Sequence, residues 1–204
     1  MPSRAKIYMA VLVLGLAAIL GGFAFYSRYS GDSRDATGPG VAAIGGSFAL
    51  TDHAGRRVTD ADYRGRYMLI FFGYTYCPDV CPTELQVMTH ALDTMGAAGE
   101  RIVPVFITVD PERDTVEQMK SYVGNFSPRL VGLTGTPEEI AAVAKAYRVY
   151  YAKSGKADAA DYLVDHSSII YLMDTEGHFL KHFTYTTDAK ALAESLASLT
   201  SASP

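Results

Sequence analysis

Two almost uninterrupted apolar runs constrain the fold of this chain more than any other feature of its sequence. Residues 67–72 and 102–109 have the length of strands and lack the polar alternation of a half-exposed sheet. Such runs are typical of strands that are buried on both faces, as in parallel sheets covered by helices. Between them, Leu85 and Met88 begin an apolar repeat at helical spacing that ends at Gly96. The sequence therefore predicts a β-α-β unit.

The remaining segments extend this alternation. We expect a hairpin over 48–58, a helix after the capping-box pattern Asp114 to Glu117, a short strand over 130–133, a helix after the capping box Thr136 to Glu139, a polar excursion over 154–161, strands over 168–173 and 179–183, and a closing helix from about Thr187. This order predicts a thioredoxin-like α/β fold. Its central, mostly parallel sheet would be flanked by helices, with a hairpin at the N-terminal end and an antiparallel hairpin near the C-terminal end.

The first forty residues differ in composition from the rest. Residues 7–26 are uncharged and apolar and follow Arg4 and Lys6, so they predict a helix that crosses about 30 Å of hydrocarbon. We expect residues 1–6 in the cytoplasm, 7–26 as a transmembrane anchor, 27–40 as a polar linker and 41–204 as the folded domain. A cleaved signal peptide is the alternative for this stretch. Both interpretations export the domain, and we expect a single-pass protein of the bacterial inner membrane with its domain in the periplasm.

Composition sets two further limits. The chain has 204 residues, of which 49% are hydrophobic, enough for one core of ordinary size. Its net charge of -4 and its dispersed Lys and Arg residues do not supply the concentrated basic face that nucleic acid requires. Nucleic-acid binding is therefore not expected.

The only two cysteines, Cys77 and Cys81, lie between the first buried strand and the helix that follows it. A disulfide closing so short a loop would restrict the unfolded chain by only about 2 kcal/mol, so a structural bridge is a weak explanation. With Pro82 in the first helical position, Cys81 would be the N-cap, where the helix dipole favours its thiolate. The pair is thus a candidate redox-active couple or a pair of metal ligands.

Histidine is the residue to examine for a third ligand, because there is no third cysteine. His166 precedes the strand over 168–173, and in a thioredoxin-like sheet this entry point lies near the helix that carries the cysteines. From spacing alone, ligand and structural roles for His166 remain equally open. Asp165 is a candidate to orient its ring. The other four histidines, at positions 53, 90, 178 and 182, are expected to have structural or solvent-exposed roles.

Three spaced motifs together resemble the Sco/SenC family of copper proteins. They are Gly-Tyr-Thr-Tyr-Cys-Pro-Asp-Val-Cys-Pro over 73–82, Val-Asp-Pro-Glu-Arg-Asp-Thr over 109–115, and Asp-His-Ser over 165–167. The resemblance spans roughly 41–199. It implies one copper ion, Cu(I) or Cu(II), held by Cys77, Cys81 and His166.

The same resemblance implies a role in assembling the binuclear copper centre of cytochrome c oxidase subunit II. That role is either delivery of copper or reduction of the acceptor cysteines, and the family does not decide between them. A second periplasmic copper chaperone and a thioredoxin-like reductant are further expected partners. Asp79 and Asp110 would add negative charge near the site, or else serve their own loops.

Four other functions compete with this one. A metal-independent thiol–disulfide oxidoreductase is the strongest, since a low-pKa thiolate paired with a second thiol is a competent reductant. A Cys₂His zinc site is another. A peroxidase of the peroxiredoxin type would have threonine where this chain has Pro78. An inert disulfide in an exported binding module is the fourth.

Overall fold

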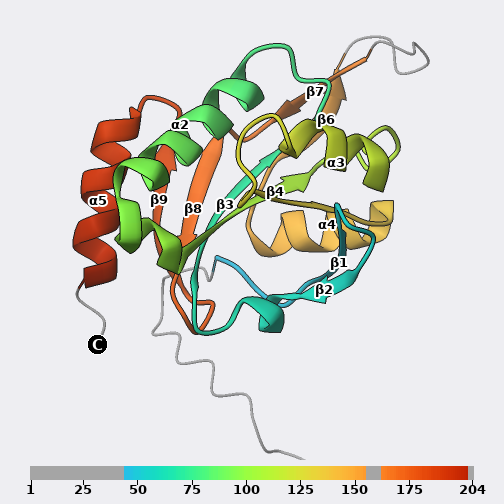
Figure 1. Cartoon of the computed structure of the whole chain (residues 1–204). Helices are drawn as coiled ribbons and strands as arrows, with labels where there is room; N and C mark the ends of the chain where they lie inside the picture. The colour runs from blue at the N-terminus through green and yellow to red at the C-terminus, as the bar shows by residue number, and fades with distance from the viewer. Residues whose placement is uncertain (1–43, 155–161, 202–204) are drawn as a thin grey trace, which may run out of the picture. The chain divides into compact units, whose positions relative to one another are not determined.

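A computed structural model describes residues 44–154 and 162–201. In chain order its elements are β1 (Ala49–Asp52), β2 (Arg57–Thr59), η1 (Asp60–Tyr63), β3 (Tyr67–Gly73), α2 (Val80–Thr94), η2 (Gly96–Arg101), β4 (Ile102–Thr108), α3 (Val116–Val123), β5 (Val131–Thr134), α4 (Pro137–Ala146), β6 (Tyr151–Ser154), β7 (Leu163–His166), β8 (Ile169–Met173), β9 (Phe179–Thr184) and α5 (Ala189–Ser201). Figure 1 shows how these elements are arranged.

The central sheet has seven strands in the order β2-β1-β5-β4-β3-β8-β9. Parallel pairing is confined to β3, β4 and β5, and both sides of this trio are completed by antiparallel strands. The expected parallel centre and the expected antiparallel hairpins β1–β2 and β8–β9 are present, but the sheet is not mostly parallel, because β1 and β8 also pair antiparallel with β5 and β3. Short turns join β1 to β2 and β8 to β9, and a short turn can only join antiparallel neighbours.

The two buried runs form the middle of this sheet, and every residue of β3 and β4 is buried. Adjacent residues of a strand point to opposite faces, and Phe71 and Phe72 show which helices cover which face. Phe71 packs on Phe106, which in turn contacts Tyr122 of α3. Phe72 packs on Tyr147, directly after α4. Helices α2 and α5 lie side by side (Figure 1), and Cys81 of α2 approaches the Phe71 face.

The helix starts agree only in part with the sequence patterns. The capping box of Thr136 and Glu139 is confirmed, with Thr136 accepting from the Glu139 N–H. The expected box at Asp114 is wrong, because Thr115 is the N-cap of α3 and accepts from the Gln118 N–H. Asp114 is instead fully buried. Its carboxylate accepts hydrogen bonds from the Thr108 hydroxyl and from both the backbone and the hydroxyl of Thr75.

A second, smaller sheet was not expected from the sequence. Strands β6 and β7 form a separate two-stranded antiparallel sheet, in which Tyr151 pairs with His166 and Ser154 with Leu163. Most of the predicted polar excursion, 155–161, lies outside the described residues, as does the predicted anchor at 7–26. Within 44–154 and 162–201, no helix is both long and apolar enough to span a membrane.

Candidate metal centre

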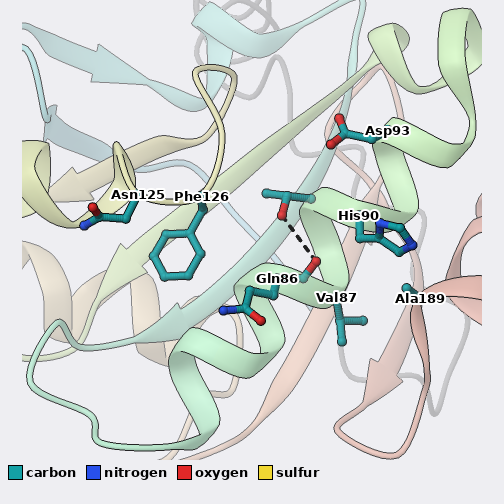
Figure 2. A pocket seen from close by; sticks show the side chains of 8 residues that line it. Gln86, Val87, His90, Asp93, Asn125, Phe126 and Ala189 are labelled. Atoms are coloured by element: carbon teal, nitrogen blue, oxygen red, sulfur yellow. Dashed lines mark hydrogen bonds between the residues drawn. The ribbon is translucent and has the colours of Figure 1, made fainter.

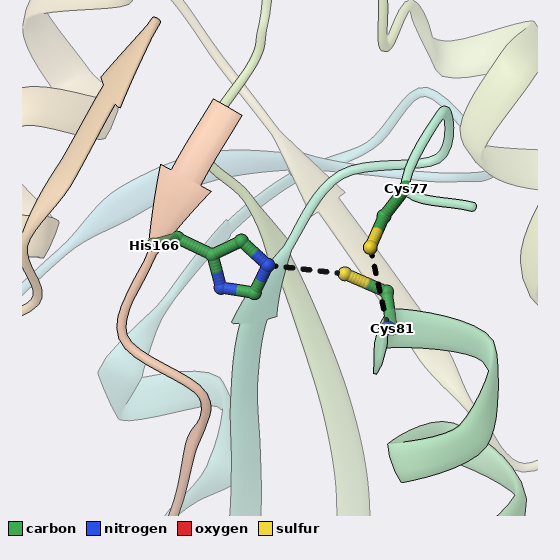
Figure 3. A group of neighbouring side chains, drawn as sticks. All are labelled: Cys77, Cys81 and His166. Atoms are coloured by element: carbon green, nitrogen blue, oxygen red, sulfur yellow. Dashed lines mark hydrogen bonds between the residues drawn. The ribbon is translucent and has the colours of Figure 1, made fainter. Parts of the chain in front are cut away.

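Three side chains from three separate segments meet at one end of the sheet. Cys77 lies in the loop after β3, Cys81 is the second residue of α2, and His166 ends β7. The Cys81 Sγ is 3.3 Å from His166 Nε2, and the two sulfurs and one ring nitrogen all lie within 4.8 Å of one another. Figure 3 shows both sulfurs and the imidazole directed at a common point. The convergence that the sequence suggested for these residues is therefore present.

The cysteine loop differs in one respect from the expected geometry. The N-cap of α2 is Asp79, so Cys81 and Pro82 are the second and third helical residues. The helix therefore begins two residues earlier than expected, after a turn in which the Cys77 N–H donates to Tyr74 O, and the Thr83 N–H donates to the Asp79 carbonyl. As a result, the Cys77 Sγ accepts the Cys81 N–H at 3.4 Å. It is Cys77, and not Cys81, whose sulfur binds the free N–H groups of the helix start.

The two thiols are free and share their protons unequally. The pKa of Cys77 is lowered to about 3, chiefly because Cys81 donates a hydrogen bond to its sulfur, with further bonds from His166 and from two backbone N–H groups; burial opposes this. The pKa of Cys81 is raised by the same hydrogen bond, by burial and by the Cys77 charge. The metal-free pair therefore consists of a Cys77 thiolate and a Cys81 thiol.

This asymmetry predicts selective alkylation of the reduced, metal-free protein. Cys77 is half-buried and Cys81 is fully buried, and only a thiolate attacks iodoacetamide. Because Cys77 stays ionised until the pH falls to its pKa of about 3, it should react at nearly the same rate at pH 5 and pH 8. Fragment mass spectrometry identifies the modified residue, and Cys77→Ser should react slowly. A Cys77 rate that rises about tenfold per pH unit, as for a thiol of pKa about 8.5, would contradict the assignment.

The His166 ring is held by aromatic packing and one backbone contact. It lies edge-on to Phe71 and Tyr74, with ring centroids at 6.0 and 5.8 Å. Its Nδ1 lies 3.3 Å from Ser167 O. A carbonyl oxygen can only accept, so Nδ1 is the donor in this contact, and Nε2 is the ring nitrogen that faces Cys81.

Asp165 does not orient this ring, contrary to the sequence-based suggestion. It is exposed, whereas Val164 and His166 are the more buried residues of β7. Neighbouring residues of a strand point to opposite faces, so the Asp165 carboxylate points away from the imidazole. Of the other two candidate carboxylates, Asp79 is exposed at the start of α2, while Asp110 is buried and bonded to Arg113 and Tyr162.

The remaining histidines lie elsewhere. His53 accepts the Gly132 N–H at 3.1 Å, and His182 stacks on Phe179. His90 lines a pocket of about 490 Å³ between α2 and the end of α3, where Phe126 and Gln86 also lie (Figure 2). His178 forms an exposed cluster with Asp174 and Glu176 in the turn before β9.

Gly73, the last residue of β3, makes room for the buried sulfur, and sequence reasoning did not single it out. A Cβ at this position would lie 2.6 Å from Cys81 Sγ and 2.9 Å from the Phe106 ring. Both distances are shorter than van der Waals contact allows. A glycine directly after a buried strand was the available signal, because isolated strand glycines often mark a close approach.

Comparison with known proteins identifies the family. The SCO1/SenC family model matches residues 36–201. The human mitochondrial SCO1 homolog is 48% identical over 160 residues, which are 78% of this chain and 53% of the human protein, so the matched region spans about half of that relative. The structure of Arabidopsis thaliana ScoI with copper bound is 48% identical, with a TM-score of 0.73 over 76% of this chain and 97% of that one. The structure of Bradyrhizobium japonicum ScoI with copper bound is 47% identical, with a TM-score of 0.71 over 76% and 99% of the two chains. The chain therefore belongs to the SCO1/SenC family, with a thioredoxin-like α/β fold.

Proposed function

We propose that this protein binds one copper ion through Cys77, Cys81 and His166 and serves in the assembly of cytochrome c oxidase. The observation that carries the proposal is the convergence of two sulfurs and one imidazole nitrogen within 4.8 Å of one another. Two relatives that are 48% and 47% identical in sequence, and whose structures are described as copper-bound, support the proposal. Thiolates are soft ligands that favour Cu(I), and imidazole suits both copper oxidation states.

The size of the triangle fits a metal ion. With bond lengths like those of zinc sites, about 2.3 Å to sulfur and about 2.0 Å to nitrogen, three ligands in a plane around an ion are separated by roughly 3.5 to 4 Å. The metal-free site has one edge of 3.3 Å and no edge above 4.8 Å. Side-chain shifts below about an ångström would therefore create the ligand set. Binding would also release the proton held by Cys81, so affinity should rise with pH.

The same geometry supports release of the ion to a partner. Cys81 is fully buried, whereas Cys77 and His166 are each partly exposed. An incoming ligand would therefore reach the ion from the Cys77 and His166 side, while Cys81 stays in the interior. Among the described residues no fourth His, Cys, Asp or Glu joins this group, which leaves a coordination position for the partner. We propose cytochrome c oxidase subunit II as that partner.

Thiol–disulfide reduction is a second function that one observation favours. In the metal-free site, the Cys77 thiolate and Cys81 thiol are adjacent and both reduced. Cys77 would attack one sulfur of a partner disulfide, forming a mixed disulfide and releasing the other sulfur as a thiolate. Attack by Cys81 would then form the Cys77–Cys81 bond and free the second partner thiol. A thioredoxin-like reductant would be needed to restore the pair, and a copper chaperone to load it.

The cellular location that we propose rests on the sequence alone. We propose that residues 7–26 anchor the chain in the bacterial inner membrane, with 1–6 in the cytoplasm, 27–40 as a linker, and the domain over 41–204 in the periplasm. A protease-accessibility assay on spheroplasts tests this topology. The domain should be digested in spheroplasts that are intact and should stay with the membrane fraction after a salt wash.

Copper titration of the reduced protein tests the proposed function. We expect one equivalent of Cu(I) to bind tightly, and one equivalent of Cu(II) to produce a thiolate-to-copper charge-transfer band. Zinc should not displace Cu(I), because a Cys₂His site of soft ligands favours the softer ion. Easy displacement by zinc would favour a zinc site, and failure to bind either ion while reducing a disulfide peptide would favour the oxidoreductase.

Enlarging Gly73 tests whether the buried sulfur must occupy its present position. In Gly73→Ala, the new methyl group would displace Cys81 Sγ or Phe106. We expect about a tenfold or greater loss of copper affinity and a fall of about 1–3 kcal/mol in the free energy of unfolding. Copper titration and urea unfolding measure the two effects. Gly46→Ala, whose Cβ would lie 3.3 Å from the Ala146 methyl group, is the control that should leave copper affinity unchanged.

A further inference from the structure

The guanidinium of Arg113 joins the segments that carry Cys77 and His166. Its central carbon lies 3.7 Å from the centroid of the Tyr162 ring and 4.7 Å from that of Tyr76, both within the range of cation–π attraction. Tyr76 directly precedes Cys77, and Tyr162 directly precedes β7, the strand that ends at His166. One largely buried cation thus contacts both ligand-bearing segments.

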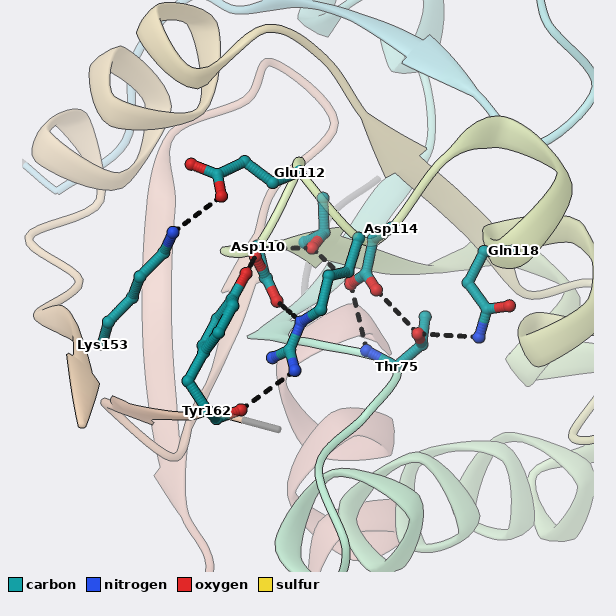
Figure 4. Close-up of polar contacts among 9 residues, drawn as sticks. Thr75, Asp110, Glu112, Asp114, Gln118, Lys153 and Tyr162 are labelled. Atoms are coloured by element: carbon teal, nitrogen blue, oxygen red, sulfur yellow. Dashed lines mark hydrogen bonds and ion pairs between the residues drawn. The ribbon is translucent and has the colours of Figure 1, made fainter. Parts of the chain in front are cut away.

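Hydrogen bonds fix this cation to the hairpin and to the loop after β4. Arg113 Nη1 donates to Tyr162 O at 2.9 Å, and Nε donates to Asp110 Oδ2 at 2.5 Å. The Tyr162 hydroxyl donates to the other Asp110 oxygen at 2.6 Å. These three bonds close a ring through Arg113, Asp110 and Tyr162. Figure 4 shows Asp110 and Tyr162, with Thr75 and Asp114 in the adjacent network. Tyr162 is therefore held through both its backbone and its side chain.

Apart from the buried Val164 and the packing of the His166 ring on Phe71 and Tyr74, the hairpin that carries His166 is bonded mainly to itself. Strands β6 and β7 pair only with each other and not with the seven-stranded sheet, and an isolated two-stranded hairpin is only marginally stable in water. At its base, the Ser167 N–H donates to Tyr150 O and the Tyr150 N–H donates to the Ser167 hydroxyl. These bonds hold the base of the hairpin to itself. The contacts of Arg113 hold it against the loop of Cys77 instead.

Burial of the Arg113 guanidinium carries a desolvation penalty. Its side chain is only 15% exposed, and within the described residues Nη2 is buried without a hydrogen-bond acceptor. A buried ion pair often adds nothing to stability compared with apolar residues of the same size. A net gain in stability is therefore not the expected effect of a charged group here.

We propose that Arg113 is a positioning residue that sets the distance between the His166 imidazole and the two sulfurs. The inference rests on the proposed copper function, since it assigns Arg113 an effect on the bound ion through His166. Loss of the guanidinium would remove the hydrogen bond to the Tyr162 carbonyl and the cation–π contacts with the Tyr162 and Tyr76 rings, and would leave the direct Tyr162–Asp110 hydrogen bond as the remaining tie of Tyr162 to the loop after β4. The start of β7 would then move away from the cysteine loop, and the imidazole would contribute less to binding.

A double-mutant cycle separates this role from a general effect on folding. Arg113→Met is made in the native chain and in the His166→Ala chain, and Cu(II) affinity is measured for all four proteins. We expect roughly a tenfold loss from Arg113→Met in the native chain, as for other residues that support a metal ligand. In the His166→Ala background the loss should be below about twofold, because Arg113 acts through the imidazole. The nitrogen coupling in the electron paramagnetic resonance spectrum should weaken in Arg113→Met.

Two further variants serve as a control and as a replacement for Arg113→Met. Lys153→Met is the control, because Lys153 lies 4.5 Å from the same Tyr162 ring but pairs with the exposed Glu112, and its affinity should match that of the native chain. Arg113→Lys keeps the charge but cannot donate to Asp110 and Tyr162 in the same fork. It should lose affinity in the same background-dependent way, and it replaces Arg113→Met if that protein does not fold by circular dichroism.

The outcomes distinguish the inference from the function on which it rests. Equal losses from Arg113→Met in both backgrounds, or no loss in the native chain, would overturn the positioning role while leaving the ligand set intact. If His166→Ala alone left Cu(II) affinity unchanged, the ligand set would be wrong and the role of Arg113 would fall with it. A loss confined to the chain that retains His166 would support both.

Discussion

Replacing either Cys77 or Cys81 by serine is expected to abolish tight copper binding. Each substitution exchanges a soft sulfur for a hard hydroxyl oxygen that remains protonated at neutral pH, and Cu(I) discriminates strongly between them. The site offers no substitute, because only two cysteines are present in the chain. The loss should exceed that from any other single substitution. Competition with a colorimetric Cu(I) chelator measures it.

The two serine variants should also differ from each other in the metal-free protein. Cys77→Ser removes the partner that raises the Cys81 pKa, so the remaining buried thiol should become easier to ionise. Cys81→Ser removes the main hydrogen-bond donor that lowers the Cys77 pKa, so the remaining thiol should titrate at higher pH. Tyr76→Phe, next to Cys77 and without change in sulfur, serves as the control for copper affinity. A stoichiometric, tight Cu(I) complex in either serine variant would contradict the proposed ligand set.

His166→Ala should lower copper affinity by about a hundredfold or more while leaving the fold intact. Removing a group that only supports a metal ligand costs about 10 to 100-fold, and removing the ligand itself should cost at least the upper value. The ring is partly exposed and packs edge-on against Phe71 and Tyr74, so its loss leaves the core of the sheet in place. Copper titration and thermal unfolding of the metal-free protein measure the two quantities.

A matched histidine variant controls for this experiment. His90 is exposed on α2, away from the sulfurs, and does not join the three-residue group. His90→Ala should therefore bind copper as the native chain does. An unchanged titration in His166→Ala would remove His166 from the ligand set and favour a simple dithiol reductant.

Much of the fold was predictable because hydrophobic burial dominates it. The runs at 67–72 and 102–109 became β3 and β4, whose residues are all buried, and the repeat after Cys81 became α2. The glycine expected to stop this helix was also a reliable signal. Gly96 follows the end of α2 with a φ of 53°, a value that glycine adopts without strain.

The errors come from positions where long-range contacts override local preference. Asp114 has the spacing of a capping box, yet the buried hydroxyls of Thr75 and Thr108 recruit its carboxylate, and Thr115 becomes the cap instead. Such a choice depends on residues far away in the sequence. Arg113 escaped notice for the same reason, since its partner Tyr162 is 49 positions away.

The meeting of the three candidate ligands was predictable from the sequence, but the orientation of the residues around them was not. The sequence suggested Cys77, Cys81 and His166, and the structure brings their three ligand atoms together. The sequence did not predict strand β7, because the four residues of this strand combine apolar, acidic and imidazole side chains without a clear alternation. Once His166 is known to end a strand, the opposite direction of Asp165 follows from strand geometry.

X-ray absorption at the copper edge tests the central claim most directly, because it counts the atoms bound to the ion. The Cu(I)-loaded native protein should show two sulfur neighbours and one imidazole nitrogen, and the imidazole signal should disappear in His166→Ala while both sulfurs remain. A copper ion with a single sulfur neighbour, or an imidazole signal that persists unchanged in His166→Ala, would contradict the account.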